Sequence, residues 1–260
     1  MALDAGTLAQ LTEAVSKFVD ERLIPLEDQV ATEDKIPETV IAEMAELGLF
    51  GLTIPAKYGG LGLNTEEECR IVMELGRAAP AFRSVIGTNN GIGSQGLVLH
   101  GTNAQRGYYL PKLASGEITG SFALTEPDAG SDSAAISLRA IADGDDFLLS
   151  GTKRYITNAT RAQLFTVFAR TNPEERGSRG ISAILVDAST PGISLGSPNK
   201  KMGQQGAHVC DVIFEECRVP QQNIVGGIER LNKGFATAMQ TLDRGRIHLA
   251  ALAVGCAKRL

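Results

Sequence analysis

The feature that most constrains this chain is a change in the spacing of its apolar residues near Gly120. Before that point, apolar residues recur every three or four positions, which is the period of a helix with one buried face. After it, short apolar runs alternate with turn residues such as those at 143–146, which is typical of strands in a barrel or sandwich. Helical spacing returns after Asn232. This order predicts a multidomain α+β protein.

We expect these three stretches of different apolar spacing to form three domains. Residues 1–118 are predicted to form an all-α domain, residues 119–229 a β-barrel or sandwich, and residues 230–260 the first helix of an all-α bundle. That last helix has a long apolar face that needs partners, so we expect a further helical region beyond Leu260. The expected helices cover residues 8–23, 41–48, 65–75, 82–99 and 103–113, and the expected strands cover residues 121–125, 138–142, 147–149, 153–157, 164–169, 181–186 and 209–214.

Composition excludes several classes of protein. The formal net charge of -5 argues against a nucleic-acid partner, which usually requires a basic face. No apolar run approaches the roughly 20 residues of a membrane span, so no membrane partner is expected. The four cysteines form no CxxC pair and the three histidines lie far apart in the sequence, so no metal site is predicted. We expect reduced thiols in a cytoplasmic protein.

The segment with the most chemistry runs from Phe122 to Asp132 and reads Phe-Ala-Leu-Thr-Glu-Pro-Asp-Ala-Gly-Ser-Asp. A predicted strand end here leads into a turn that carries the hydroxyls of Thr125 and Ser131 and free backbone N–H groups. Such a turn can present hydrogen-bond donors to an electron-rich ring or a carbonyl oxygen. The same composition also suits a plain polar connection between strands, so the residues alone leave both interpretations open.

This segment resembles the first signature of the acyl-CoA dehydrogenase family, which has the form Thr-Glu-x-x-x-Gly-Ser-Asp. Three further segments resemble the family in its order: a loop at 55–60 (Pro-Ala-Lys-Tyr-Gly-Gly), an aromatic-Ile-Thr strand at 153–158 (Lys-Arg-Tyr-Ile-Thr-Asn), and an Asp-x-x-Arg segment at 242–246 (Leu-Asp-Arg-Gly-Arg). The resemblance covers essentially the whole chain. It implies FAD-dependent α,β-dehydrogenation of an acyl-CoA thioester to the trans-2-enoyl-CoA.

The resemblance also implies which residues bind the cofactor and the substrate. In the family, the first signature lies along the isoalloxazine ring, the aromatic residue packs against the ring, and the Thr of the Ile-Thr strand donates a hydrogen bond near flavin N5. The family often has Trp at the position of the aromatic residue, where this chain has Tyr. The implied cofactor-binding residues are Phe122, Leu124, Thr125, Gly130, Ser131, Tyr155, Ile156 and Thr157, and the implied substrate-binding residues are Ser131, Asp243 and Arg246.

No catalytic residue is expected within this chain. The family's base is a Glu that lies in one of two places, and the first is immediately before the Arg of the Asp-x-x-Arg segment, where this chain has Gly245. The second place would lie beyond Leu260. The resemblance further implies that electrons pass to an electron-transfer flavoprotein, and that the protein is a homotetramer or homodimer.

Several alternatives remain open at this stage. Acyl-CoA oxidases, nitroalkane oxidases and some flavin monooxygenases share the architecture, and the missing base keeps open a non-catalytic subunit of a heteromeric assembly. The stretch Gly91–Gly96 matches the dinucleotide fingerprint GxGxxG. It follows no convincing strand, so we interpret it as helix of the first domain, near where an acyl tail would lie.

A few polar residues are interpreted as structural or solvated. They are Glu126 and Asp128 in the turn of the first signature, the acidic run at 66–68, and His208. For Arg244 and Arg246, which flank an apolar helix, an ordinary surface position is the alternative interpretation.

Overall fold

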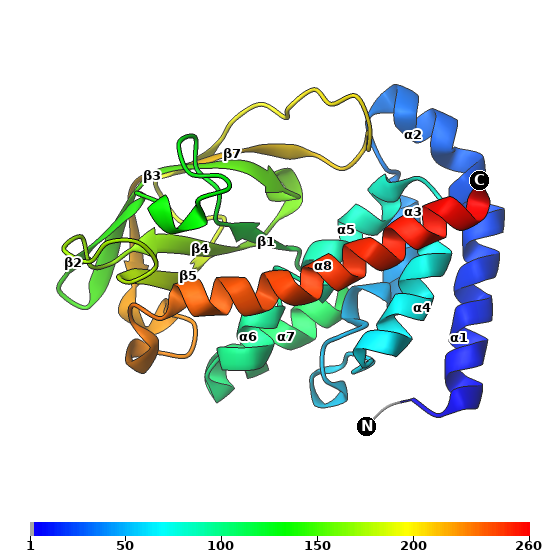
Figure 1. Ribbon diagram of the computed structural model, residues 1–260, viewed down its shortest axis with the longest axis horizontal. Helices are drawn as coiled ribbons and strands as arrows, with labels where there is room; N and C mark the ends of the chain where they lie inside the picture. Colours follow the sequence, from blue (N-terminus) through cyan, green and yellow to red (C-terminus); the bar gives the residue numbers. More distant parts are fainter. Residues whose placement is uncertain (1–2) are drawn as a thin grey trace.

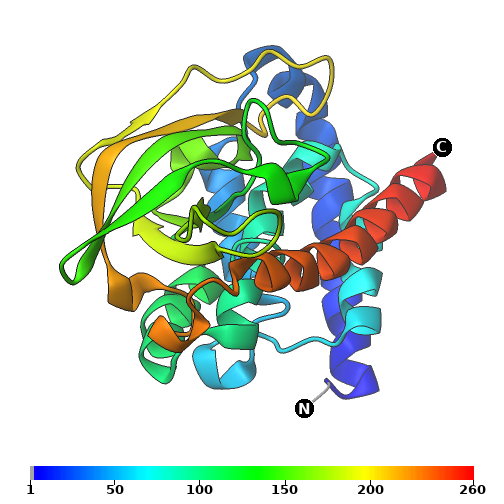
Figure 2. The same cartoon turned by 60° about the vertical axis from the view of Figure 1, so that its left-hand side comes forward.

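The protein is described here by a computed structural model that covers residues 3–260. A group of helices lies beside a curled sheet, and the last helix, α8 (Gly234–Arg259), runs across both (Figures 1 and 2). The predicted order of a helical part, a β part and a final helix is therefore confirmed. Because α8 contacts strand β5 (Ile181–Asp187) as well as helix α4 (Thr65–Leu75), it closes the region where the two parts meet.

The helical part is built around one apolar core. Two of its helices begin where the sequence provides a capping box: Asn64 and Glu67 cap α4, and Thr102 and Gln105 cap α7, so their first N–H groups are satisfied locally. The helices before the sheet are α1 (Ala5–Phe18), α2 (Glu27–Glu33), α3 (Glu38–Glu46), α4, α5 (Pro80–Asn90), α6 (Gln95–His100) and α7 (Asn103–Ser115).

Two predicted helix boundaries were wrong. The chain does not leave the helical path at Pro25, but passes through a π-helical turn and a 3₁₀ turn into α2, because proline is tolerated in the first turn of a new helix. The predicted helix over residues 82–99 is broken at residues 91–94 into α5 and α6. The GxGxxG stretch therefore begins in this turn, and among residues 3–79 no strand precedes α5 as a dinucleotide fold would require.

The β part is a single seven-stranded sheet. Its strand order is β1-β4-β2-β3-β7-β6, with β5 paired to β4; β1 and β4 are parallel, whereas β3 and β7 form a long antiparallel pair. The strands are β1 (Gly120–Ala123), β2 (Arg139–Asp143), β3 (Asp146–Thr157), β4 (Leu164–Arg170), β5, β6 (Ile193–Leu195) and β7 (Val209–Pro220). The sheet curls around its own apolar core, which includes Phe147, Phe165 and Phe214.

The strands predicted at 147–149 and 153–157 are one strand, β3. Two shifts of register against β7, at Leu149/Gly151 and at Lys153/Ile156, interrupt the two-residue alternation of buried side chains. Such bulges redirect side chains without ending a strand, and they explain why the pattern looked like two strands. Strand β6 and the extension of β7 to Pro220 were not predicted.

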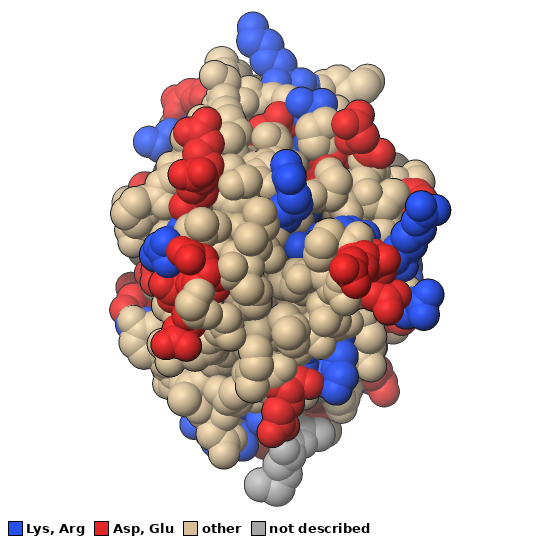
Figure 3. All heavy atoms as spheres, turned by 90° about the vertical axis from the view of Figure 1, so that its left-hand side faces the viewer, with Lys and Arg blue, Asp and Glu red and all other residues tan. Residues whose placement is uncertain are grey.

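The face at the sheet end of the molecule carries acidic and basic side chains interspersed with uncharged ones (Figure 3). That face therefore lacks the basic patch that nucleic-acid binding needs. None of the helices in residues 3–260 is long and apolar enough to cross a membrane.

Candidate functional site

All eight residues predicted to bind the cofactor line one cavity of ≈ 440 Å³. It opens where β1, the turn after β1 and the end of β3 meet α8. Of the residues predicted to bind substrate, Ser131 and Arg246 line it. Asp243 does not: its exposed carboxylate instead accepts a hydrogen bond from Arg246, with Nη1 and Oδ1 2.5 Å apart. The other lining residues are Ile92, Ser133, Met239 and Leu242.

The second bulge of β3 gives the cavity its aromatic side chain. At this bulge Tyr155 adopts a left-handed backbone conformation, with φ of 57°, and its side chain is 61% exposed. Lys153 and Ile156, which precede and follow it in β3, are buried. A non-glycine residue with positive φ is uncommon and is retained where the surroundings require it. Here it directs an aromatic ring towards the cavity.

The lining of this cavity fits a flavin ring. Phe122 and Leu124 provide an apolar floor, and Phe122 packs on the buried Phe168 with ring centroids 4.7 Å apart. Several hydroxyl groups at the cavity hydrogen-bond to no other group within residues 3–260, among them those of Thr125, Ser131 and Thr157. Free donors beside an apolar floor suit a planar ring with polar edges, particularly one that gains negative charge on reduction.

A buried ion pair holds the turn that carries these donors. Glu126 accepts hydrogen bonds from the backbone N–H groups of Ser137 and Leu138, at 2.7 and 2.9 Å, and from Lys153 Nζ at 2.8 Å. Lys153 also donates to the Leu124 carbonyl at 2.9 Å. Glu126 was predicted to be solvated or structural, and the structure shows the structural role.

The two partners respond differently to burial. Burial lowers the pKa of Lys153 to about 8, despite the nearby carboxylate. Burial alone would raise the pKa of Glu126, but the charge and hydrogen bond of Lys153, with the two backbone donors, hold it below its ordinary value. Both groups are charged at neutral pH, and each depends on the other.

A second cavity, of ≈ 290 Å³, adjoins the first. The two share four residues: Ile92, Thr157, Leu242 and Arg246. The second lies between α5 and α8, and Gly91 and Ile92 of the GxGxxG stretch line it. Residues that reach only this cavity include Arg83, Gly87 and Gly91 before the sheet, and Gly245 and Leu249 on α8.

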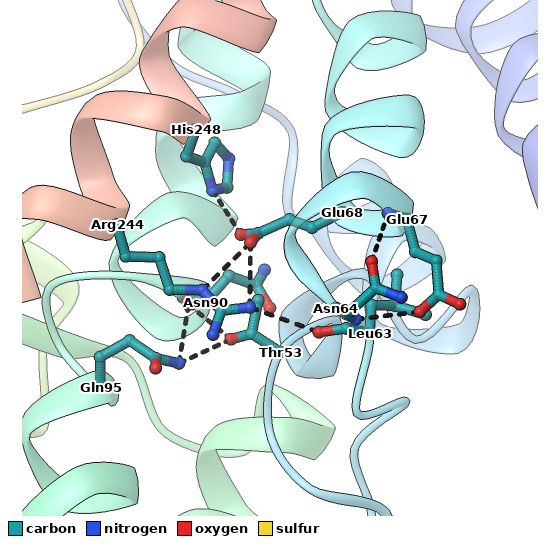
Figure 4. Close-up of polar contacts among 9 residues, drawn as sticks. All are labelled: Thr53, Leu63, Asn64, Glu67, Glu68, Asn90, Gln95, Arg244 and His248. Atoms are coloured by element: carbon teal, nitrogen blue, oxygen red, sulfur yellow. Dashed lines mark hydrogen bonds and ion pairs between the residues drawn. The ribbon is translucent and has the colours of Figure 1, made fainter. Parts of the chain in front are cut away.

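A buried polar cluster beside this cavity joins α4 to α8 (Figure 4). The Glu68 side chain is 2% exposed, and its Oε2 accepts from Arg244 Nε and Nη2 at 3.2 and 3.1 Å. The other oxygen, Oε1, lies 2.8 Å from Nδ1 of the buried His248. Arg244 additionally donates to the Leu63 carbonyl at 3.3 Å. Glu68 is thus a fixed link between helices that are 180 residues apart in sequence.

Sequence reasoning missed this cluster, although a signal was present. Glu68 lies in phase with the apolar residues Ile71, Val72 and Leu75, so it belongs to the buried stripe of α4. Arg244 and His248 are four residues apart and therefore lie on one face of α8. The interpretation of Arg244 as an ordinary surface residue was wrong. His208, by contrast, is structural: its Nε2 lies 2.8 Å from the Asp34 carbonyl oxygen.

The turn of the GxGxxG stretch is fixed by hydrogen bonds among buried side chains, also drawn in Figure 4. Thr53 donates to the Asn90 carbonyl at 2.5 Å, and Gln95 donates to the Thr53 hydroxyl at 2.9 Å. The stretch therefore has a packing role, and it places Gly91 and Ile92 at the wall of the second cavity.

His248 makes stability depend on pH. Burial lowers the pKa of His248, in spite of its contact with Glu68, so the folded protein holds it neutral below the pH at which the unfolded chain protonates it. The contribution of His248 to the free energy of unfolding is therefore fully present above about pH 6.5. Below that pH it falls by up to about 1.4 kcal/mol per pH unit, until the pH reaches the pKa of His248 in the folded protein. We expect thermal melts between pH 7.5 and 5.5 to show this slope, and His248→Gln to flatten it. An unchanged slope in His248→Gln would contradict the assignment.

Comparison with solved structures places this fold in a known class. The chain superposes on butyryl-CoA dehydrogenase from Megasphaera elsdenii with a TM-score of 0.92 and 30% identity, covering 100% of this chain and 67% of that one. It superposes on an acyl-CoA dehydrogenase complexed with FAD from Bacillus anthracis with a TM-score of 0.88 and 31% identity, covering 98% of this chain and 43% of that one.

The sequence comparisons agree. Residues 7–117 match the acyl-CoA dehydrogenase N-terminal domain, and residues 121–217 match the acyl-CoA dehydrogenase middle domain. The chain therefore belongs to the acyl-CoA dehydrogenase family. The acryloyl-CoA reductase (NADH) of Anaerotignum propionicum is 39% identical over 250 residues, which are 95% of this chain and 62% of the relative. The chain spans less than two thirds of the length of such curated relatives.

Proposed function

We propose that this chain is the flavin-binding part of an enzyme that dehydrogenates an acyl-CoA thioester at the α and β carbons, giving the trans-2-enoyl-CoA. The observation that carries the proposal is the convergence of eight predicted residues on one cavity that shares a wall with a second cavity of ≈ 290 Å³. FAD is the cofactor, since the free hydroxyls and apolar floor suit its ring and a solved relative is complexed with FAD. When bound, FAD accepts the hydride that leaves the β carbon.

The residues of this chain bind the cofactor and the substrate and polarise the reacting groups. They do not remove the proton. We propose that Thr125 and Thr157 donate hydrogen bonds to the ring and that Tyr155 packs against it. Ser131 and Gly130 would contact a cofactor phosphate or the pantetheine arm of the substrate, and Arg246, at the wall shared by both cavities, would lie near the thioester. Positioned donors of this kind lower the barrier because they stabilise charge that develops during the reaction.

The catalytic base is proposed to come from another part of the whole protein. Within residues 3–260 no Asp or Glu lines either cavity, and Gly245 occupies the position before Arg246 where some family members carry the base. A carboxylate delivered to the open side of the cavities would complete the site.

We further propose that electrons leave to an electron-transfer flavoprotein and that the enzyme is a cytoplasmic homotetramer or homodimer. The four cysteines are free thiols in the structure, which fits a reducing compartment.

The deciding experiment is anaerobic mixing of the purified full-length protein with a panel of acyl-CoAs while the visible absorbance of oxidised flavin is followed. Bleaching by one class of acyl-CoA supports dehydrogenation and identifies the substrate. Rapid reoxidation by air would favour an oxidase. Bound flavin that no acyl-CoA bleaches would count against the proposal and favour a non-catalytic subunit.

The opposite direction of the same chemistry is a second candidate, because a 39% identical relative is an acryloyl-CoA reductase. It is tested by reducing the flavin first and then adding a 2-enoyl-CoA. Reoxidation that is much faster than bleaching by the saturated thioester would favour a reductase.

One residue-level prediction concerns the cofactor. Replacing Thr125 with Val keeps the shape of the side chain but removes its donor, so we expect FAD affinity to fall by up to about tenfold, which is the usual worth of one hydrogen bond. The measurement is FAD titration of the apoprotein by fluorescence quenching. Thr65→Val, at an exposed position on α4, is the matched control and should leave the affinity unchanged. Equal affinities for wild type and Thr125→Val would remove Thr125 from the cofactor site.

A further inference from the structure

Asn158 directly follows Thr157 at the end of β3, and the chemistry proposed above gives it no role. The residue is 2% exposed, and its backbone is left-handed, with φ of 62°. Asparagine adopts this conformation more readily than most residues with a side chain. Buried polar side chains are normally hydrogen-bonded, so the partners of Asn158 show what it does.

The side-chain amide of Asn158 links the sheet to helix α5. Its Nδ2 donates to the carbonyl oxygens of Ser84 and Val85, at 2.9 and 3.2 Å, and to the Thr88 hydroxyl at 2.9 Å. Both carbonyls lie inside α5, where backbone N–H groups of the helix already donate to them, so the amide is not needed to complete the helix. Its effect is to join the end of β3 to α5.

This link and two others hold the backbone around Thr157. The Thr157 carbonyl oxygen accepts a hydrogen bond from Ser121 Oγ in β1 at 2.7 Å, and the Asn158 N–H donates to the His208 carbonyl oxygen at 2.9 Å. Thr157 lines both cavities, and its hydroxyl makes no hydrogen bond to another group of residues 3–260. A free donor serves a ligand only if its backbone stays in place, because a hydrogen bond weakens steeply with distance and angle.

We propose that Asn158 is a positioning residue that fixes the Thr157 hydroxyl at the flavin ring by tying the end of β3 to α5. This inference rests on the proposed function, in which Thr157 donates to the ring. A well-placed donor stabilises the negative charge of the reduced ring and so raises the reduction potential of bound FAD. Loss of the Asn158 amide should therefore lower this potential, although Asn158 itself lines neither cavity.

A purely structural role for Asn158 is the competing explanation. In that case its loss would lower the stability of the protein and leave the reduction potential unchanged, or it would change the potential independently of Thr157. A double-mutant cycle distinguishes the two explanations, because residues that act through one another have non-additive effects.

The experiment measures the reduction potential of FAD bound to the full-length protein, by anaerobic equilibration with a reference dye. Thr157→Val removes the donor, and we expect the potential to fall by about 30 mV, which is a tenfold change in the equilibrium constant of a two-electron couple. Asn158→Gly removes the amide and keeps the left-handed backbone accessible, and it should give most of this fall. Asn158→Gly added to Thr157→Val should lower the potential almost no further.

The matched control is Asn232→Gly. Asn232 also has a left-handed backbone, with φ of 63°, and its Oδ1 accepts a hydrogen bond from the Thr171 hydroxyl at 2.7 Å. This variant should lose stability but keep the wild-type potential. Asn158→Ser retains one donor at the position and is the milder second variant, which should lower the potential by less than Asn158→Gly. It replaces Asn158→Gly in the cycle if the glycine variant does not fold.

Three outcomes would overturn the inference: a wild-type potential in the folded Asn158 variants, additive falls in the double variant, or a wild-type potential in Thr157→Val. Flavin content and melting temperature show that each variant is folded. The proposed function is judged separately, since bleaching of the flavin by an acyl-CoA supports it whatever the potentials of the variants are. A full-length protein that binds no FAD would contradict both.

Discussion

Replacing Glu126 with Gln is expected to lower the free energy of unfolding by about 3–5 kcal/mol, the usual cost of breaking a buried ion pair. The variant leaves the Lys153 ammonium, whose side chain is 0% exposed, without its counter-charge. The amide oxygen can still accept hydrogen bonds, but the NH2 group that replaces the other carboxylate oxygen cannot, so the amide does not serve Lys153 and both backbone donors of Ser137 and Leu138 as the carboxylate does. Because Lys153 also binds the Leu124 carbonyl, we expect FAD affinity to fall as well.

Urea denaturation of the FAD-loaded protein measures this effect. Asp128→Asn is the matched control: it removes an acid two residues away that is exposed and unpaired, and should change stability by less than about 0.5 kcal/mol. Adding Lys153→Met to Glu126→Gln should recover part of the loss, since the stranded charge is then gone. Equal stabilities for Glu126→Gln and Asp128→Asn would contradict a buried pair.

Replacing Gly255 with Ala is expected to destabilise the protein by about 2 kcal/mol or more, although alanine is the better helix former by about 1 kcal/mol. Helices α4 and α8 cross so closely that a Cβ at residue 255 would lie 2.2 Å from the Met73 carbonyl oxygen and 2.8 Å from Gly76 Cα. Both are backbone atoms, so the helices would have to separate, and the Glu68 link between them would be strained.

The control lies on the same helix. A Cβ at Gly245 would meet only Ile92, at 3.4 Å, which is ordinary contact. Gly245→Ala should therefore be neutral or stabilise by up to about 1 kcal/mol through helix propensity alone. Urea denaturation without substrate measures both variants. If the two substitutions have equal effects, the close crossing of α4 and α8 is not what constrains residue 255.

Local signals account for what the sequence predicted well. The capping residues Asn64 and Thr102, the turn after Thr125 and the change of spacing near Gly120 are all encoded within a few residues, so element types and their order followed. Two short segments were singled out by resemblance, and the structure places the residues of both at one cavity; that this cavity binds the flavin stays a prediction.

The features that the sequence did not predict depend on contacts between residues that are distant in sequence. The pairing of Lys153 with Glu126 requires β3 to bulge, and periodicity arguments treat a bulge as the end of a strand. The link from Glu68 to Arg244 requires knowledge of which helices cross. Asn158 was overlooked because an asparagine after a strand is ordinary, and only its hydrogen bonds to α5 make it notable.

Under the proposed function, the shared wall between the two cavities restricts how acyl specificity can diverge. A change at Ile92 or Leu242 would alter the proposed cofactor site together with the proposed substrate pocket. Variation that spares the cofactor is confined to residues that reach the second cavity alone, among them Gly91, Gly245 and Leu249. At the two glycines a substitution can only fill space, so it narrows the range of substrates. Acceptance of longer acyl chains requires a smaller residue in place of a larger one such as Leu249.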